Sequence, residues 1–366
     1  MYQALYRKYR PKLFNEIIGQ EHITKTLASQ IQSGNINHAY LFTGSRGTGK
    51  TSTAKIFAKA INCLNPQNGS PCYECNVCKA LADNNNVDIM EIDAASNNRV
   101  DEIRDIREKV KFLPINGKYK VYIIDEVHML TESAFNALLK TLEEPPKHIV
   151  FILATTEVHK LPATIISRCM RFDFHLISDD ILINQLKDIF NKENIKCEEG
   201  AYRLIAKAAQ GSDRDMLSIA DCMVAYSGGN ITTEQVMKIL GNTNHETYLG
   251  ICDAINKKDI GNALLTVDKI EREGKNMTVV AKDLTICYRN LLVASTCSNP
   301  NTILGFTDEI LQKYVTLAKN IPLNELMDNM KVFSSIEAEI KYALSPKTLI
   351  ETAIVTCVSG DQEKKN

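Results

Sequence analysis

The octapeptide GSRGTGKT at residues 44–51 constrains the fold of this chain more than any other feature of the sequence. It matches the pattern G-x-x-x-x-G-K-[ST], it follows the strand-like run AYLFT, and it precedes the helical run TSTAKIFAKAI. A strand, a glycine-rich loop and a helix in this order form a phosphate-binding loop, because backbone N–H groups and the helix N-terminus then surround the phosphates. A chance glycine-rich turn is the alternative, but it would not require all three elements together. The motif therefore predicts an ATP site.

The residues of this loop have separate expected roles. Lys50 is expected to reach the β- and γ-phosphates, and the Thr51 hydroxyl is expected to bind Mg²⁺. The remaining residues form the cradle whose N–H groups face the phosphates: Gly44, Ser45, Arg46, Gly47, Thr48 and Gly49. ATP and Mg²⁺ are thus the cofactors that this motif predicts.

Short apolar runs alternate with helical periodicity between residue 36 and about residue 175, which predicts a parallel α/β sheet. After about residue 177 the strand pattern fades, and amphipathic helical patterns continue to about residue 358. We therefore predict three domains: an α/β P-loop domain at 1–177, a small helical domain at 178–243, and an all-helical domain at 244–366. The predicted strands are HAYLF (38–42), VDIMEID (87–93), KVYIID (120–125), HIVFILATT (148–156) and MRFDF (170–174).

The strand VYIID ends in Asp125 and Glu126, so both carboxylates are expected at the carboxyl edge of the sheet, where ligands of open α/β sheets bind. We expect Asp125 to hold Mg²⁺ through water and Glu126 to orient or deprotonate the attacking water. Thr155, at the end of the next apolar strand, is placed to hydrogen-bond the γ-phosphate or that water. A solvated acidic turn and an ordinary strand-end threonine are the alternatives. For His128, beside the acidic pair, we predict packing at the turn, because Glu126 already supplies a base.

Four of the 11 cysteines are closely spaced in the polar loop LNPQNGSPCYECNVC, in the order Cys63-x8-Cys72-x2-Cys75-x2-Cys78. Four thiolates suit tetrahedral Zn²⁺, and a site with four cysteine ligands is closed to substrate and therefore structural. Unmetallated surface thiols and a redox pair are the alternatives. The other seven cysteines stand alone in apolar or helical runs and are expected to be small core residues: Cys169, Cys197, Cys222, Cys252, Cys287, Cys297 and Cys357.

Charge and hydropathy exclude several classes of protein. The 43 basic and 44 acidic residues give a net charge of −1, so the chain lacks the global positive field of a nucleic-acid coat and any DNA contact is local. No apolar stretch follows the basic amino terminus and no apolar run reaches the length of a membrane span, so a cytoplasmic protein is expected. The odd cysteine count and the length of 366 residues argue against a secreted disulfide scaffold.

Several motifs resemble the bacterial clamp-loader subunits, which are AAA+ ATPases. The segments GSRGTGKT, IIDEVHML, NALLKTLEEPP, LATTE and SRC occur in the order and spacing of that family. The opening YRPKLFNEIIGQEH looks like the segment on the nucleotide-base side. The resemblance covers at least residues 1 to 241 and is to the gamma/tau subunits of DNA polymerase III. It implies an AAA+ domain with a zinc-binding insertion at 62–79, a helical lid, and an all-α collar for oligomerisation.

The resemblance also implies roles that the motifs alone do not assign. Arg168 of the SRC segment is implied to act in trans, as an arginine finger in the ATP site of a neighbouring subunit. Arg214, in the segment GSDRD, resembles the second-sensor arginine and is implied to touch the γ-phosphate from the lid. The cysteine quartet resembles the zinc module of gamma/tau, which favours Zn²⁺ over free thiols.

Contact with DNA follows from the resemblance as well. Arg99, Arg104 and Lys140 match family positions that track duplex phosphates, and such contacts are independent of base sequence. Asn97 stands where a basic residue is expected in that family. The alternative for Arg104 is a surface ion pair with Asp101 or Glu108 on the same helix.

The resulting hypothesis is an ATP-driven clamp-loader subunit of the bacterial replicative DNA polymerase III. Its implied partners are other clamp-loader subunits (delta, delta-prime and further gamma/tau copies), a sliding clamp and primer–template DNA. Two alternatives stay open: another AAA+ remodeller or branch-migration motor, and a non-hydrolysing scaffold subunit of a clamp loader. The cysteine insertion weighs against the first alternative, and the intact P-loop and acidic pair weigh against the second.

Overall fold

The structure is a computed structural model, and it describes residues 3–82, 86–96, 108–239, 245–306 and 308–359. The chain divides into two compact units, Met1–Met237 and Lys238–Asn366, which are described separately below. The predicted division into three domains with boundaries at 177 and 243 stays a prediction.

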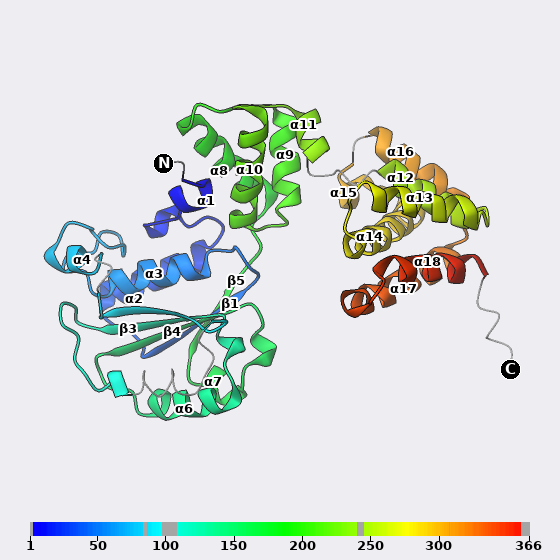
Figure 1. The fold of residues 1–366 in the computed structure, drawn as a ribbon. Coiled ribbons are helices and arrows are strands. Elements are labelled where there is room, and N and C mark those ends of the chain that lie inside the picture. The colour runs from blue at the N-terminus through cyan, green and yellow to red at the C-terminus, as the bar shows by residue number, and fades with distance from the viewer. Residues whose placement is uncertain (1–2, 83–85, 97–107, 240–244, 307, 360–366) are drawn as a thin grey trace. The chain divides into compact units, whose positions relative to one another are not determined.

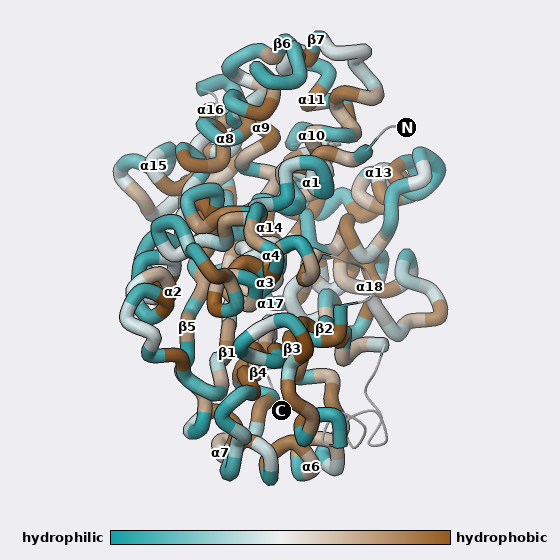
Figure 2. The backbone as a smooth tube through the Cα atoms, turned by 90° about the vertical axis from the view of Figure 1, so that its left-hand side faces the viewer, coloured by the Kyte–Doolittle hydropathy of each residue, from teal (hydrophilic) through white to brown (hydrophobic). Residues whose placement is uncertain are grey.

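A five-stranded sheet forms the centre of the first unit (Figure 1). The strands lie in the order β2-β3-β4-β1-β5 and all pairs are parallel, as the alternating sequence pattern predicts. Apolar residues run along β3 and β4 (Figure 2), and both strands are buried because helices cover the two faces of the sheet (Figure 1). The strands are β1 (Ala39–Gly44), β2 (Ile89–Asp93), β3 (Lys120–Asp125), β4 (Ile149–Thr155) and β5 (Met170–Phe174).

Helices pack on both faces of this sheet (Figure 1). On one face, α2 (Glu21–Ser33) and α3 (Lys50–Ala60) enclose a core that includes Leu27 and Phe57. On the other face, α6 (Glu132–Glu143) and α7 (Ala163–Ile166) enclose a second core. Because every strand runs in the same direction, the loops after the strands meet at one edge, and in register Asp93 lies opposite Asp125.

Further helices of the first unit follow the sheet. The helices are α8 (Asp179–Lys192), α9 (Glu199–Ala208), α10 (Asp213–Ser227) and α11 (Thr233–Ile239), whose last two residues belong to the second unit. The sequence reading placed only helices beyond residue 177, and this is wrong at two points, since β6 (Lys196–Cys197) and β7 (Asn230–Ile231) pair in parallel. Strands of two residues are too short to leave a period-2 pattern, so sequence periodicity cannot reveal them. The unit also contains α1 (Leu5–Lys8) and α4 (Asn76–Ala80).

The described residues of the second unit form helices, as the sequence predicts. Their buried faces, with Tyr288 and Phe333 stacked between α14 and α17, form one apolar core. Cys252 and Cys287 lie in this core, as expected of isolated cysteines, whereas Cys222 of the first unit is exposed and corrects that expectation. The helices are α12 (His245–Asn256), α13 (Ile260–Arg272), α14 (Met277–Thr296), α15 (Asn301–Leu304), α16 (Asp308–Lys319), α17 (Leu323–Glu339) and α18 (Pro346–Ser359).

Candidate nucleotide-binding site

The predicted P-loop joins β1 to α3 at the carboxyl edge of the sheet. Gly44, Gly47 and Gly49 have φ angles of 140°, 76° and 101°, which residues with a Cβ rarely adopt. Lys50 Nζ donates to the carbonyl oxygens of Gly44 and Ser45, each at 2.8 Å, so the ammonium group lies inside the curve of the loop. Burial lowers the pKa of Lys50, and the carboxylates of Glu126 and Asp125 oppose this shift. The loop therefore holds a buried positive charge where phosphates are expected.

The acidic pair lies beside this loop, as the strand pattern predicts. Thr51 Oγ1 donates to Asp125 Oδ2 over 2.7 Å, so the two oxygens expected to hold Mg²⁺ are already adjacent. Oxygen ligands of this kind, completed by water and phosphate, suit Mg²⁺. When bound, the ion would neutralise charge on the phosphates.

Glu126 has an unusual backbone conformation. Its φ of 48° and ψ of 43° lie in the left-handed region, which costs a residue with a Cβ about 1–2 kcal/mol. Its carboxylate accepts a hydrogen bond from Thr156 Oγ1 at 3.2 Å. Strain of this kind is typical of residues whose orientation matters for function.

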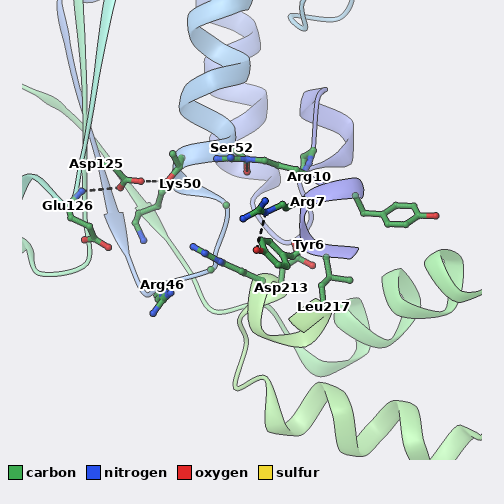
Figure 3. Close-up of a pocket in the computed structure, with 16 residues that line it drawn as sticks. Tyr6, Arg7, Arg10, Arg46, Lys50, Ser52, Asp125, Glu126, Asp213 and Leu217 are labelled. Carbon is green, nitrogen blue, oxygen red and sulfur yellow. Dashed lines mark hydrogen bonds between the residues drawn. The ribbon is translucent and has the colours of Figure 1, made fainter. Parts of the chain in front are cut away.

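A cavity of about 500 Å³ lies between the P-loop, the N-terminal segment and α10 (Figure 3). Both Lys50 and Glu126 line it, and Arg214 enters from the lid side. The lining residues are Tyr6, Arg7, Tyr9, Arg10, Pro11, Arg46, Gly47, Gly49, Lys50, Thr51, Ser52, Asp125, Glu126, Asp213, Arg214 and Leu217. The structure thus brings most of the predicted nucleotide-binding residues to one cavity.

The N-terminal segment contacts both α10 and α3, the helix that follows the P-loop. The backbone N–H of Leu5 donates to the Asp221 carboxylate of α10, at 2.8 Å to Oδ2, and Arg10 Nε donates to Ser52 Oγ of α3 at 3.3 Å. The Arg214 guanidinium lies over the Tyr6 ring, 5.6 Å from its centroid. Sequence reasoning missed Tyr6, because nothing in a local pattern relates it to the lid.

The P-loop touches the start of α10 directly. The backbone N–H of Asp213 donates to the Gly47 carbonyl at 3.1 Å, and a Cβ on Gly47 would lie 1.9 Å from Ser212 Oγ. Only glycine therefore permits this close approach. Burial raises the pKa of Asp213 to about 6, and this residue was another that the sequence did not indicate.

The remaining predicted residues lie outside this cavity. Thr155 is fully buried, and its hydroxyl contacts His128 and the backbone N–H of Glu157, so its role toward the γ-phosphate stays a prediction.

The residues predicted to contact a neighbouring subunit or DNA also lie away from the cavity. Arg168 pairs with Glu143 at 2.8 Å. Lys140 is exposed on α6. Arg99 and Arg104 lie outside the described residues, so the structure does not place these two DNA predictions.

The four clustered cysteines converge on one point. Their sulfur atoms all lie within 4.8 Å of one another, with Cys63 Sγ 3.4 Å from Cys72 Sγ and Cys72 Sγ 3.9 Å from Cys78 Sγ. Four sulfurs around a zinc ion at 2.3 Å would be about 3.8 Å apart, so this cluster fits the ion. Burial raises the pKa of Cys75, but backbone N–H groups of Cys78 and Leu64 outweigh it and hold the pKa at about 6. The pKa of Cys72 is also lowered, by backbone hydrogen bonds, whereas burial raises the pKa of Cys63 and of Cys78. Cys72 and Cys75 are therefore the two thiols whose pKa favours a thiolate before a metal binds.

We predict about one Zn²⁺ per chain, bound by these four thiols and released on acidification. Protonated thiols do not bind zinc, so protons displace the metal as the pH falls. Released zinc can be followed with a chromogenic chelator. Cys75→Ser should lose the metal, whereas Cys222→Ser should keep it, because Cys222 lies outside the cluster. A folded parent chain that carries no zinc would refute the assignment.

Together, the parallel sheet, the P-loop at its carboxyl edge, the acidic pair and the helical lid define an AAA+ ATPase. Subunit gamma of DNA polymerase III from Buchnera aphidicola subsp. Acyrthosiphon pisum is 37% identical over 98% of this chain and 99% of its own length. The chain therefore belongs to the gamma/tau family of DNA polymerase III subunits. Family models match most of it: "DNA polymerase III, delta subunit" at 19–178, "DNA polymerase III clamp loader subunit, ATPase lid domain" at 182–229, and "DNA polymerase III subunits gamma and tau domain III" at 231–364.

Other relatives are longer than this chain. Subunit tau of Bacillus subtilis strain 168 is 44% identical over 97% of this chain, which covers 63% of that protein. The chain covers only 40% of subunit tau from Escherichia coli K12, at 45% identity over 69% of this chain. A solved structure of a mutant RuvB from Thermotoga maritima aligns with a TM-score of 0.50 at 19% identity, over 84% of this chain and 91% of that one. At this identity the similarity concerns the fold alone. In the described residues, no helix is long and apolar enough to span a membrane.

Proposed function

We propose that this chain is an ATP-hydrolysing subunit of a clamp loader. The observation that carries the proposal is that four groups expected to take part in hydrolysis line one cavity. Lys50 and Thr51 belong to the P-loop and the start of α3, whereas Asp125 ends β3 and Glu126 follows it. A non-hydrolysing scaffold subunit would have no need for the whole set. The family membership adds the clamp-loader context.

Each of these groups would have its own role in hydrolysis. Lys50 would exchange its two carbonyl partners for phosphate oxygens and offset the charge that develops during transfer. Glu126 would accept the proton of the attacking water while the bond between the γ-phosphorus and the bridging oxygen breaks. Thr51 and Asp125 would hold the magnesium ion, and Arg214 would bring the lid to the γ-phosphate. Thr155, which is buried outside the cavity and contacts His128, stays a predicted partner of the γ-phosphate or the attacking water.

Assembly supplies the remaining groups in this proposal. Arg168 does not line the cavity of its own chain, which supports a role as the arginine finger of a neighbouring subunit. The all-helical segment 244–366 would hold subunits together, and the zinc cluster would stabilise the insertion. The partners would be delta, delta-prime and further gamma/tau copies, with a sliding clamp as the substrate. Primer–template DNA would contact Arg99, Arg104 and Lys140.

A retention experiment with a sliding clamp tests the clamp-loader proposal. The immobilised full chain, assembled with its partner subunits, should retain the clamp when ATP is present and lose it without nucleotide. ATP binding is expected to drive this difference, so a Lys50→Ala chain should retain the clamp poorly in both conditions. Clamp retention that is absent with ATP, or equal with and without it, would overturn an ATP-driven role.

A further inference from the structure

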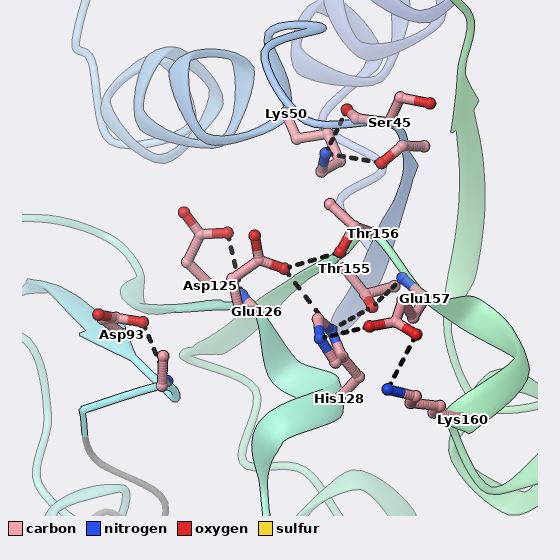
Figure 4. A network of polar contacts seen from close by, with 12 residues as sticks. Ser45, Lys50, Asp93, Asp125, Glu126, His128, Thr155, Thr156, Glu157 and Lys160 are labelled. Carbon is pink, nitrogen blue, oxygen red and sulfur yellow. Dashed lines mark hydrogen bonds and ion pairs between the residues drawn. The ribbon is translucent and has the colours of Figure 1, made fainter. Parts of the chain in front are cut away.

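His128 occupies a buried position directly behind the candidate catalytic carboxylate (Figure 4). It belongs to the short helix η2 (Val127–Met129), which follows Glu126, and only 6% of its side chain is exposed. The imidazole ring lies between the carboxyl end of β3 and that of β4, where Thr155 ends the strand and Thr156 and Glu157 follow it. A buried ring at this point can contact residues at the ends of both β3 and β4.

Both ring nitrogens have polar neighbours. His128 Nδ1 lies 2.9 Å from Thr155 Oγ1 and 3.5 Å from Glu126 Oε2. His128 Nε2 lies 3.4 Å from Glu157 Oε1. On the far side, Glu157 Oε2 pairs with Lys160 Nζ at 2.9 Å. The ring therefore stands between two carboxylates, one facing the cavity and one tied to the surface.

Thr155 ties the ring to the backbone that follows β4. Its hydroxyl oxygen accepts a hydrogen bond from the backbone N–H of Glu157 at 2.9 Å and lies 2.9 Å from His128 Nδ1. Each ring nitrogen therefore has a partner that belongs to β4 or follows it. With both nitrogens occupied, the ring cannot rotate without losing a contact.

We propose that His128 is a positioning residue that holds the Glu126 carboxylate in its working orientation by tying the ends of β3 and β4 together. The inference deepens the proposed ATPase function and rests on it. Thr156 Oγ1 donates to the same Glu126 oxygen that faces His128, at 3.2 Å. The Glu126 carboxylate is thus bordered by groups from both strands, while 34% of its side chain remains exposed.

The alternative is that His128 only fills space at the turn, as its sequence position alone suggests. The positioning role and the space-filling role predict different effects on ATP turnover. His128 is not among the residues that line the cavity, whereas Glu126 is, so a positioning role changes turnover and leaves nucleotide binding unchanged. A displacement of a reacting group by about 1 Å can cost about a hundredfold in rate.

The first test compares three full-length variants, with ATP turnover and the Kd of a non-hydrolysable ATP analogue as readouts. His128→Phe keeps the ring volume but has no polar atoms, and it should lower turnover about a hundredfold with a Kd within about twofold of the parent. His128→Asn retains a polar atom near the Nδ1 position and should recover a large part of the loss. His159→Ala is the matched control, because His159 also faces Glu157 but is 73% exposed, and it should turn over like the parent.

The second test is a double-mutant cycle with Glu126→Gln. If His128 acts through Glu126, then adding His128→Phe to Glu126→Gln should lower turnover no further than Glu126→Gln alone. Independent, multiplicative losses would overturn the proposal, as would parent-like turnover of both His128 variants. A parent chain that binds ATP without hydrolysing it would instead refute the proposed function, so the two failures are distinguishable. If His128→Phe melts without cooperativity, His128→Asn and its cycle decide the matter.

Discussion

Replacing Lys50 by alanine is expected to abolish measurable ATP turnover, with a loss of at least about 10²–10³-fold. Lys50 is 6% exposed, and its ammonium group lies inside the curve of the P-loop, where the phosphates are expected. Removing it leaves the developing charge of the γ-phosphate without this partner. Turnover of the full chain, measured by phosphate release, is the direct readout.

The same substitution should affect stability only modestly. Lys50 is buried, and its ammonium group donates to the carbonyls of Gly44 and Ser45. Loss of these hydrogen bonds should cost about 1 kcal/mol, or a shift in melting temperature of about 2–4 °C for a unit of this size. Lys55→Ala is the matched control, since Lys55 lies on the same helix, pairs with Glu91 and does not line the cavity. Unchanged turnover in the Lys50→Ala chain would rule out the P-loop assignment.

The residues of this site that could be predicted from the sequence belong to motifs whose members lie close together along the chain. The P-loop is one continuous motif, and the position of Asp125 follows from a general property of parallel sheets, whose carboxyl ends share one edge. The proximity of Thr51 and Asp125 could therefore be expected from the sequence. The same holds for the cysteine cluster, because three of its four members lie within seven residues of one another.

The site residues that could not be predicted contact partners that lie far away in the sequence and meet only in the folded chain. Tyr6 reaches Arg214 only because α1 and α10 pack together, and no local pattern records that packing. Asp213 lies at the P-loop because the neighbouring residue Ser212 packs closely against Gly47. This contact also forms only when the helix α10 has folded against the loop. For His128, sequence reasoning correctly expected a place at the turn but could not see the partners on β4. Contacts of this kind are fixed by tertiary packing and escape periodicity analysis.

Arg168→Ala is expected to lower the ATP turnover of the assembled protein by about 10³-fold or more, by analogy with arginine fingers supplied in trans. Within its own chain the guanidinium pairs with Glu143 at 2.8 Å, and its side chain is 34% exposed. An exposed ion pair of this kind contributes about 0–1 kcal/mol, so Arg168 can exchange Glu143 for a phosphate of a neighbouring subunit at little cost. Arg171→Ala is the control, because Arg171 is another surface arginine with a carboxylate partner, Asp173.

Mixing two inactive chains distinguishes a trans role from a cis role. An Arg168→Ala chain keeps its own P-loop, and a Lys50→Ala chain keeps its own finger, so one kind of interface in the mixture joins an intact pocket to an intact finger. In a head-to-tail ring of randomly mixed subunits, roughly a quarter of the interfaces are of this kind. Turnover should therefore rise from near zero for each variant alone to roughly a quarter of the parent value, and only at concentrations where the chains assemble. If Arg168 served its own pocket, no mixture would recover activity, because each chain would carry a complete defect. Parent-like turnover of Arg168→Ala by itself would reduce this arginine to a surface charge paired with Glu143.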